Sequence, residues 1–187
     1  GYDDNVLRLS DKEIGEPLYD IGINSTLDSP ILKPSIMAIY SPIIFDQNKT
    51  NIIASFSYSH FTQLKEKSYY ISKVSLEIKL KPYSWIKLGV RDIPRYYLRN
   101  YYDRDMEMED YISCTFSSQK FFGSYSFPLH FFSKSWLKLY FESTKEYYNK
   151  HFTEYDLKKK MIQFDYNQKI NKRFILKLFI STGEADN

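Results

Sequence analysis

The sequence predicts an all-β fold: an antiparallel, up-and-down transmembrane β-barrel that forms part of a larger barrel. Polar and apolar residues alternate along several segments, which is typical of strands whose successive side chains point to opposite faces. One strand pattern occurs twice, beginning at Trp85 and at Trp136, and in both copies a pair of Tyr residues stands eleven and twelve positions after the Trp. Short turns alternate with longer charged segments, as expected for successive hairpins.

The two Trp-led segments have the length and the borders of a strand that crosses a membrane. In the first copy, Ile86, Leu88 and Val90 share one face, and Lys87 and Arg91 share the other. Eleven residues in a strand tilted by about 40° rise roughly 28 Å. This rise is close to the ~25 Å apolar band of a membrane barrel, which is bordered by aromatic residues at both interfaces. The pattern therefore favours a membrane barrel.

Composition narrows the class further. Aromatic residues make up 18% of the 187 residues, with 18 Tyr and 14 Phe, and they favour strands. The sequence contains no apolar run long enough for a helical membrane span. A formal net charge of +3 gives no support for nucleic-acid binding. Because Cys114 is the single cysteine and the three His lie far apart, we expect no internal disulfide, no metal site and no cofactor.

The first thirty residues are the least regular part of the sequence. Residues 6–9 fit a short strand, and the Gly, Pro and Asp-Ser-Pro signals of residues 10–30 predict a long loop. A strand pattern follows over residues 31–45, although Pro34 and Pro42 weaken it because each lacks a ladder donor. We therefore divide the chain into an irregular N-terminal segment, residues 1–30, and barrel hairpins over residues 31–187.

Three strands are predicted next. Residues 46–50 form a turn by composition. Apolar residues alternate with Ser over residues 52–59, and alternation returns over residues 74–81. Residues 81–84 then turn the chain into the strand that begins at Trp85. Residues 98–108 form a longer charged loop.

The following segment changes its phase. Ile112, Cys114 and Phe116 carry the apolar parity first, whereas Phe121 and Tyr125 carry the opposite parity after residues 118–120. A bulge in one long strand would produce this slip, and so would a separate turn. We favour the bulge.

The last strands follow the same rhythm. Residues 132–135 lead into the strand that begins at Trp136, and residues 143–153 form a charged and aromatic loop. Alternation over residues 162–167 precedes a turn at 168–172 and a final strand from Phe174 to Thr182. Residues 183–187 are predicted to be a loop. With the N-terminal piece included we count nine strands, and because bacterial membrane barrels usually have an even number, we expect the polypeptide to continue. If residues 1–10 are not a strand, eight strands remain and a complete small barrel is the alternative.

Taken over residues 31–182, the chain resembles bacterial outer-membrane β-barrel proteins of the porin-like type. The resemblance rests on the hairpin rhythm, the two Trp-to-Tyr-Tyr strands and the short turns before Ile52, Trp85, Trp136 and Phe174. It implies a Gram-negative outer membrane, contact with outer-membrane lipid and transport of small polar solutes or ions. The chain departs from the pattern at Asn187, where such barrels close on a strand with a terminal aromatic residue. No family's functional residues can be carried over from a resemblance at this level.

On this reading, the polar parity of the strands would line the lumen, and its slightly basic charge would favour anions or polar solutes. The opposing interpretation is that these residues are solvated or paired within a narrow interior that does not conduct. The pore-lining candidates are Ser55, Ser57, Ser59, Glu77, Lys79, Lys87, Arg91, Lys138, Glu142, Gln163, Asp165 and Lys177.

The aromatic borders are predicted to anchor the strands at the two membrane interfaces. Core packing and a sugar-stacking platform remain alternatives for the Trp residues and the Tyr pairs. The membrane-interface candidates are Trp85, Tyr96, Tyr97, Trp136, Tyr147, Tyr148 and Phe174.

Other functions remain open beside a channel. A non-conducting barrel that scaffolds a partner protein in a surface complex is the main alternative, with residues 10–30 as a plug or a docking strap, and a homo-oligomer is also compatible. A soluble β-domain is less favoured. We expect no enzymatic activity, because no Ser and His are paired by position. The acidic run at residues 103–110 does not match the spacing of a calcium loop.

Overall fold

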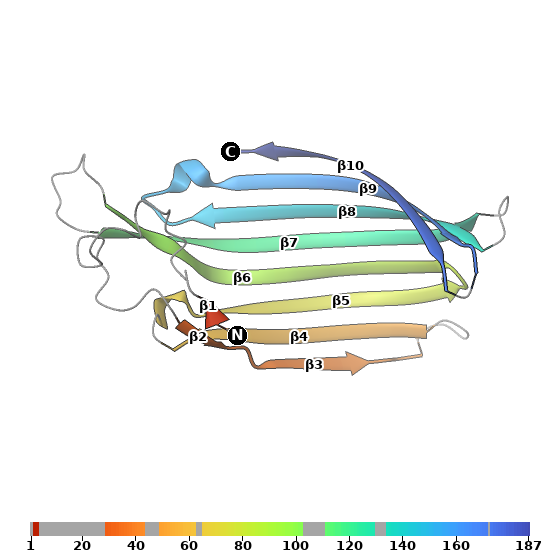
Figure 1. Ribbon diagram of the computed structural model, residues 1–187, viewed down its shortest axis with the longest axis horizontal. Coiled ribbons are helices and arrows are strands. Elements are labelled where there is room, and N and C mark those ends of the chain that lie inside the picture. Colours follow the sequence, from red (N-terminus) through yellow and green to blue (C-terminus); the bar gives the residue numbers. More distant parts are fainter. Residues whose placement is uncertain are drawn as a thin grey trace.

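A computed structural model describes residues 2–3, 29–43, 49–62, 65–102, 111–129, 134–171 and 173–187. It contains one antiparallel, up-and-down sheet, in which strands follow each other in chain order (Figure 1). The main strands are β4 (Lys49–Phe61), β5 (Tyr69–Lys81), β6 (Ser84–Tyr102), β7 (Tyr111–Leu129), β8 (Ser135–Tyr148), β9 (Leu157–Lys169) and β10 (Ile175–Asp186). The predicted all-β, up-and-down architecture is confirmed.

The N-terminal edge is built from short pieces. β1 (Tyr2–Asp3) pairs with β2 (Ser29–Leu32), whereas β2 and β3 (Ser35–Tyr40) both pair with different parts of β4. β2 and β3 are thus one edge strand interrupted at residues 33–34, where Pro34 lacks a ladder donor. The predicted weakness at Pro34 is therefore confirmed. The strand expected at residues 6–9 lies outside the described residues.

The single long strand predicted across residues 112–127 is confirmed, but the predicted bulge at residues 118–120 is wrong. β7 pairs with β8 without a shift of register from Phe116 to Leu129. The register shifts lie in β6, between Ile93 and Tyr96 and between Tyr97 and Arg99. The apolar parity of the sequence changes because Phe116 packs against Tyr96 and Tyr148 on the otherwise polar face. The change of apolar parity therefore reflects aromatic packing at Phe116 and not a bulge.

The loop predicted at residues 183–187 is also wrong for most of its length. β10 continues to Asp186, which pairs with Lys158 of β9. Gly183 belongs to this ladder opposite Met161, so a residue that usually weakens strands is held by its neighbour strand. Within the described strands, β10 and the N-terminal edge do not pair with each other, and the sheet is open. Closure into a barrel is therefore not seen.

The two ends of the sheet differ, as the sequence predicted. β5 and β6 are joined through the tight turn at Pro82 and Tyr83, where Tyr83 adopts a φ of 63°. The connections at the other end are longer than the β5–β6, β7–β8 and β9–β10 turns, although the β3–β4 connection at the turn end is as long as they are. Two of the longer connections contain the 3-10 helices η2 (Lys65–Lys67) and η3 (Thr153–Tyr155). Figure 1 shows this alternation, with the short β5–β6 turn at the right. No helix within the described residues is long and apolar enough to cross a membrane.

The two faces of the sheet are buried in the opposite sense from those of a typical soluble protein, because apolar side chains are exposed on one face and charged side chains are sheltered on the other. Val90, Phe121 and Phe164 leave 50%, 46% and 52% of their surfaces exposed on one face. The Glu142 and Asp165 side chains on the other face are only 16% and 15% exposed. We call the first the apolar face and the second the polar face. Buried apolar side chains are few among the described residues, and a conventional core between two layers is not formed.

Candidate functional site

The strand register collects the polar parity of the sequence on one face. Residues directly opposite each other in neighbouring strands point to the same face. One row joins Glu77, Lys87, Ser124, Tyr140 and Gln163 across five strands. A second row joins residues from β4 to β10 in the same way: Lys49, Lys79, Trp85, Ser126, Lys138, Asp165 and Phe179.

All described candidates for the lumen wall lie on this polar face. Ser55 and Ser57 of β4 stand opposite Lys73 and Ile71 of β5. Lys177 of β10 stands opposite Asn167 of β9. The candidates that share this face are Ser55, Ser57, Ser59, Glu77, Lys79, Lys87, Arg91, Lys138, Glu142, Gln163, Asp165 and Lys177. Their role as a channel lining stays a prediction.

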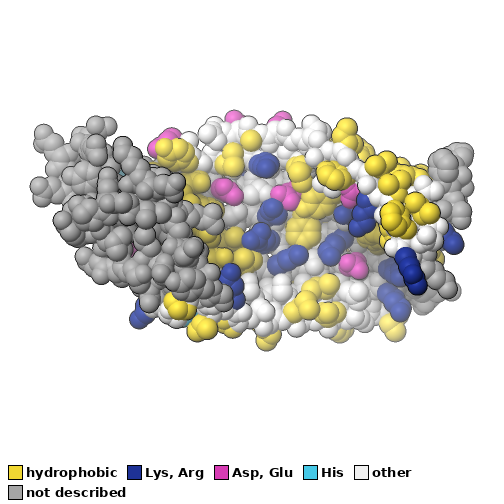
Figure 2. Space-filling view, viewed as in Figure 1, with side chains coloured by type: hydrophobic (Ala, Val, Ile, Leu, Met, Phe, Trp, Pro, Cys, Tyr) yellow, Lys and Arg dark blue, Asp and Glu magenta, His cyan; other side chains and the backbone are white. Residues whose placement is uncertain are grey.

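The middle of the polar face forms a cleft of about 600 Å³. Its lining comes from β5, β6, β7 and β8, and Figure 2 shows Lys and Arg side chains in dark blue gathered over this part of the surface. Five of the lining residues are cationic and two are acidic, so the cleft is basic overall. The charged residues that line it are Lys73, Lys87, Arg91, Lys120, Lys138, Glu77 and Glu142.

Three ion pairs balance part of this charge. Lys87 Nζ lies 3.3 Å from Glu77 Oε2, and Lys138 Nζ lies 3.5 Å from Asp165 Oδ2. The third pair joins Lys120 to Glu142 at 2.7 Å. These pairs link neighbouring strands, because their members stand opposite or nearly opposite each other.

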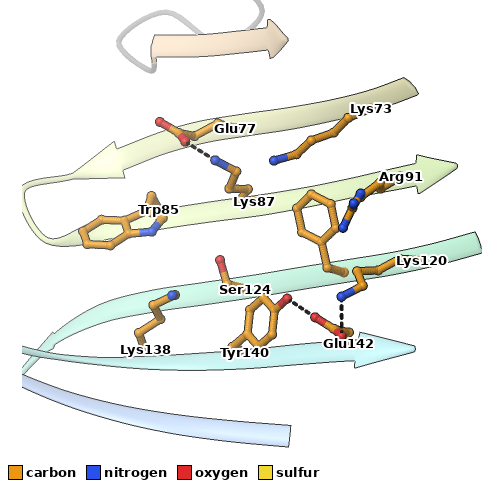
Figure 3. A pocket seen from close by; sticks show the side chains of 11 residues that line it. Lys73, Glu77, Trp85, Lys87, Arg91, Lys120, Ser124, Lys138, Tyr140 and Glu142 are labelled. Atoms are coloured by element: carbon orange, nitrogen blue, oxygen red, sulfur yellow. Dashed lines mark hydrogen bonds and ion pairs between the residues drawn. The ribbon is translucent and has the colours of Figure 1, made fainter. Parts of the chain in front are cut away.

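Glu142 is held by more than its ion pair. Its carboxylate accepts the hydroxyl protons of Tyr140 at 2.6 Å and Thr144 at 3.3 Å, in addition to the contact with Lys120. Figure 3 shows Tyr140 and Lys120 both directed toward this carboxylate. Two hydroxyls and an ammonium therefore satisfy one charge that is mostly withdrawn from water.

A glycine allows an aromatic ring to form part of the cleft. Phe122 stands opposite Gly89 on the polar face. A Cβ at Gly89 would clash with the Phe122 ring and would lie 2.9 Å from the Cβ of Ser75. Without that atom, the ring packs against β6, and the Lys73 ammonium lies 5.2 Å from its centroid.

The Trp residues lie on the polar face, which differs from the orientation that lipid anchors need. Trp85 shares the side of Lys87, and Trp136 shares the side of Lys138. The Tyr83 ring stacks on the Trp136 ring with 4.8 Å between their centroids, and the centroid of the Trp85 ring lies 6.5 Å from that of Trp136. In both Trp-led segments the Trp has the parity of the charged residues, a signal present in the sequence. The ring contacts show that both Trp residues pack together with Tyr83, and interface anchoring, core packing and sugar stacking all stay predictions.

The two residues of each Tyr pair lie within a strand, β6 or β8, and point to opposite faces of the sheet. Tyr96 and Tyr148 both pack against Phe116, whereas Tyr97 is buried to 4% exposure with Lys67 5.7 Å from its ring centroid. Tyr147 is exposed on the apolar face, because it stands opposite Ser117 and alternates with Tyr148. Phe174 is exposed beside the β9–β10 turn. Of the interface candidates, these last two have the exposure that contact with lipid requires.

Several cleft residues were missed by the sequence reasoning. Lys73 has the polar parity of β5, and Tyr140 has that of β8, so alternation could have found both. Lys120 lies within residues 118–120, where the bulge was predicted, and Phe122 lies just after them. The wrong bulge obscured which face they occupy.

A Ser and a His approach each other at the loop end of the sheet. Ser68 Oγ lies 3.4 Å from His60 Nδ1, and the Phe61 amide donates to the same hydroxyl at 3.1 Å. Within the described part of the chain, no carboxylate contacts His60 to complete a catalytic arrangement. The described residues also contain no cluster of three His, Cys, Asp or Glu side chains that could hold a metal ion.

Comparisons of the chain with protein families, with curated proteins and with solved structures found no match.

Proposed function

We propose that this chain forms part of a bacterial outer-membrane β-barrel whose polar face lines a path for small polar solutes or ions. The observation that carries the proposal is the inverted burial of the two faces. Apolar side chains such as Phe164 are exposed, while charged side chains such as Asp165 are sheltered. This distribution suits a sheet whose outer face contacts lipid and whose inner face contacts water.

The dimensions of the apolar face support the proposal. Four adjacent rows of the register are almost entirely apolar, and no charged residue stands in the three rows nearest the turn end among the described residues. The first and fourth rows are six residues apart, which is about 20 Å along a strand and about 15 Å along the axis of a barrel with strands tilted by about 40°, so these rows cover more than half of the usual ~25 Å apolar band. The fourth row ends at Lys160 and Glu184, which form an exposed ion pair of 3.1 Å.

Strand length also supports a membrane barrel. The seven main strands contain between 12 and 19 residues. Strands of about 9–11 residues suffice to cross a membrane, whereas strands of soluble proteins usually contain about 5–6. The longest strands, β6 and β7, would extend beyond the bilayer at the loop end.

A soluble β-domain would need a second layer over the apolar face. Soluble monomers rarely expose a continuous apolar patch of more than a few hundred Å². Here the exposed residues form a continuous surface over β4 to β10, for example through Ile52, Leu88, Phe141 and Ile162 in one row. The described residues supply no layer to cover them. Lipid is the partner that this surface fits best.

The proposal is tested by refolding the full chain from denaturant into detergent and inserting it into a planar bilayer. We expect a β-sheet circular dichroism spectrum, heat-modifiable migration on a gel and a steady ohmic conductance. A protein that is folded and monodisperse in buffer without detergent, and that aggregates with micelles, would contradict the membrane assignment.

A non-conducting scaffold barrel is the second candidate, and the ion pairs favour it. Pairs such as Lys87–Glu77 and Lys120–Glu142 cross the cleft wall and restrict its free charge. A correctly folded, heat-modifiable barrel that carries no current would support a scaffold that binds a partner protein in a surface complex. Deletion of residues 10–28, which leaves β2 intact, separates the two cases, because removal of a plug would open a current.

A further inference from the structure

We infer that the cleft contains an oxyanion-binding site, formed by Lys73, Arg91 and Lys120, for the phosphate or sulfate group of a water-borne solute. The register places Lys73 opposite Arg91 and Arg91 opposite Lys120. Three cations therefore stand side by side on β5, β6 and β7, with the Cβ atoms of neighbours about 5 Å apart. We call this set the basic row.

Like charges directly opposite each other in a sheet oppose folding unless they are compensated. Lys120 is compensated by Glu142 at 2.7 Å. Within the described residues, Lys73 and Arg91 form no ion pair with a carboxylate. Glu77 and Asp165 pair with Lys87 and Lys138, and Glu146 stands in the next row of the same face, opposite Ser118. The basic row thus retains two uncompensated cations beside a third.

The geometry of the cleft supports a bound anion. Figure 3 shows Arg91 and Lys120 with their charged ends close together, whereas Lys73 extends along the cleft toward Lys87, and its ammonium lies 5.2 Å from the centroid of the Phe122 ring. The Phe122 ring, which the absence of a side chain at Gly89 accommodates, lies between these strands and contacts Lys73. The cleft of about 600 Å³ has room for an anionic group together with a small organic body.

The chemistry of the three side chains selects the type of anion. A guanidinium presents paired N–H donors that match two oxygens of a phosphate or sulfate, whereas an ammonium acts as a point charge. One Arg between two Lys therefore suits a tetrahedral oxyanion better than a halide. The inference rests on the proposed function only for the source of the ligand. If the polar face is the inner face of a barrel, it contacts dissolved solutes, and a lipid headgroup would not reach the basic row.

The first test measures binding of inorganic phosphate to the detergent-folded full chain by titration calorimetry, at constant ionic strength and pH 7. We expect phosphate to bind at least tenfold more tightly than chloride. The double variant Lys73→Gln/Arg91→Gln should weaken phosphate binding by at least tenfold. Arg91→Lys, which keeps the charge and removes the paired donors, should give an intermediate loss.

The matched control is Lys79→Gln/Lys177→Gln, which removes two positive charges from the same face outside the basic row. We expect it to change phosphate binding by less than twofold. Equal losses in the two double variants would overturn the site, because they would reflect the general charge of the face. Equal affinity of the unaltered protein for phosphate and chloride would overturn it as well, independently of any variant.

The same titration separates this inference from the channel proposal. A folded barrel that binds phosphate and carries no current would retain the site and reject the channel. A conducting barrel that does not discriminate phosphate from chloride would retain the channel and reject the site. Phosphate added to a planar bilayer should reduce single-channel current in the unaltered protein and not in the Lys73→Gln/Arg91→Gln variant.

Discussion

At the scale of the residue, the polar face depends on a few charges that are largely withdrawn from water. Glu142 holds the most contacts, with Lys120, Tyr140 and Thr144 around one carboxylate. Glu77 of the same face also pairs with a lysine, Lys87, at 3.3 Å, but it is more exposed, at 36% against 16% for Glu142. The two pairs offer a matched comparison of a sheltered and an exposed interaction.

We predict that Glu142→Gln lowers the free energy of unfolding by about 1–3 kcal/mol, because it removes a sheltered charge that accepts charge-assisted hydrogen bonds. The measurement is the midpoint of urea unfolding in detergent micelles. The control Glu77→Gln on the same face should cost less, about 1 kcal/mol at most, since its ion pair with Lys87 is more exposed and exposed ion pairs contribute little. Equal effects of the two substitutions would contradict the arrangement around Glu142.

We predict that Gly89→Ala destabilises the fold by about 1–3 kcal/mol, because the added Cβ meets the Phe122 ring and the Cβ of Ser75. In the double variant Gly89→Ala/Phe122→Ala the loss should be smaller than the sum of the two single losses. Gly123→Ala is the control, because its Cβ would meet only the end of the Leu88 side chain at 3.1 Å. Additive losses in the double variant would show that Phe122 does not occupy this space.

The parity of single residues also shows where sequence reasoning succeeded and failed. Alternation placed the described pore-lining candidates on one face, as Lys87 and Lys138 illustrate. The same parity assigns Trp85 and Trp136 to that face, and their role as interface anchors stays a prediction. An aromatic residue at the end of a strand does not reveal by its type which side it faces.

At the scale of the element, the two faces of each strand are predicted to differ in their tolerance of charge. Phe164 and Gln163 are neighbours in β9 and point to opposite faces. We predict that Phe164→Lys prevents folding or costs about 2–4 kcal/mol, because it places a charge on the lipid side.

The control for this prediction is Gln163→Lys, which adds the same side chain on the polar face beside Asp165. It should fold normally, with unchanged heat-modifiability on a gel. In a soluble protein whose apolar face is bathed by water, Phe164→Lys would be neutral or would increase solubility. Folding yields of the two variants in micelles therefore decide which solvent the apolar face meets.

The strands could be predicted from the sequence. The residues at which they end and the positions of their register shifts were predicted less well. Period-two alternation identified β4 to β9, because strands with one face in each environment keep that period. The loops predicted at residues 98–108 and 143–153 begin too early, since β6 continues to Tyr102 and β8 to Tyr148. Alternation missed the last residues of β10, since Gly183 and the charged residues after it lack any apolar alternation and are held by pairing with β9. It misplaced the irregularity of the β6–β7 pair, because a register shift depends on both strands together.

At the scale of the whole molecule, the fold is one curved sheet with few buried apolar side chains among its described residues. Such a sheet cannot be stabilised in water by a core between two layers. Stability would instead come from the strand ladders, from the ion pairs of the polar face and from contact between the apolar face and lipid. The sequence predicted the all-β, up-and-down sheet, but closure of the sheet requires pairing that the described strands do not show.

The central claim, that the apolar face contacts lipid and the polar face contacts water, is tested most directly by spin-label accessibility. Single Cys residues would be placed along β8 and β9 at Lys138, Leu139, Tyr140, Phe141 and each of residues 162–165 in a Cys114→Ala background, and the protein would be folded into liposomes. Cys114 is buried, so its removal leaves the labelled faces unchanged.

The prediction is an alternation with a period of two. Labels at Leu139, Phe141, Ile162 and Phe164 should collide more with oxygen, which partitions into lipid, and labels at the intervening positions should collide more with a polar nickel complex. Collision rates without alternation, or apolar-face labels that favour the nickel complex, would contradict the account.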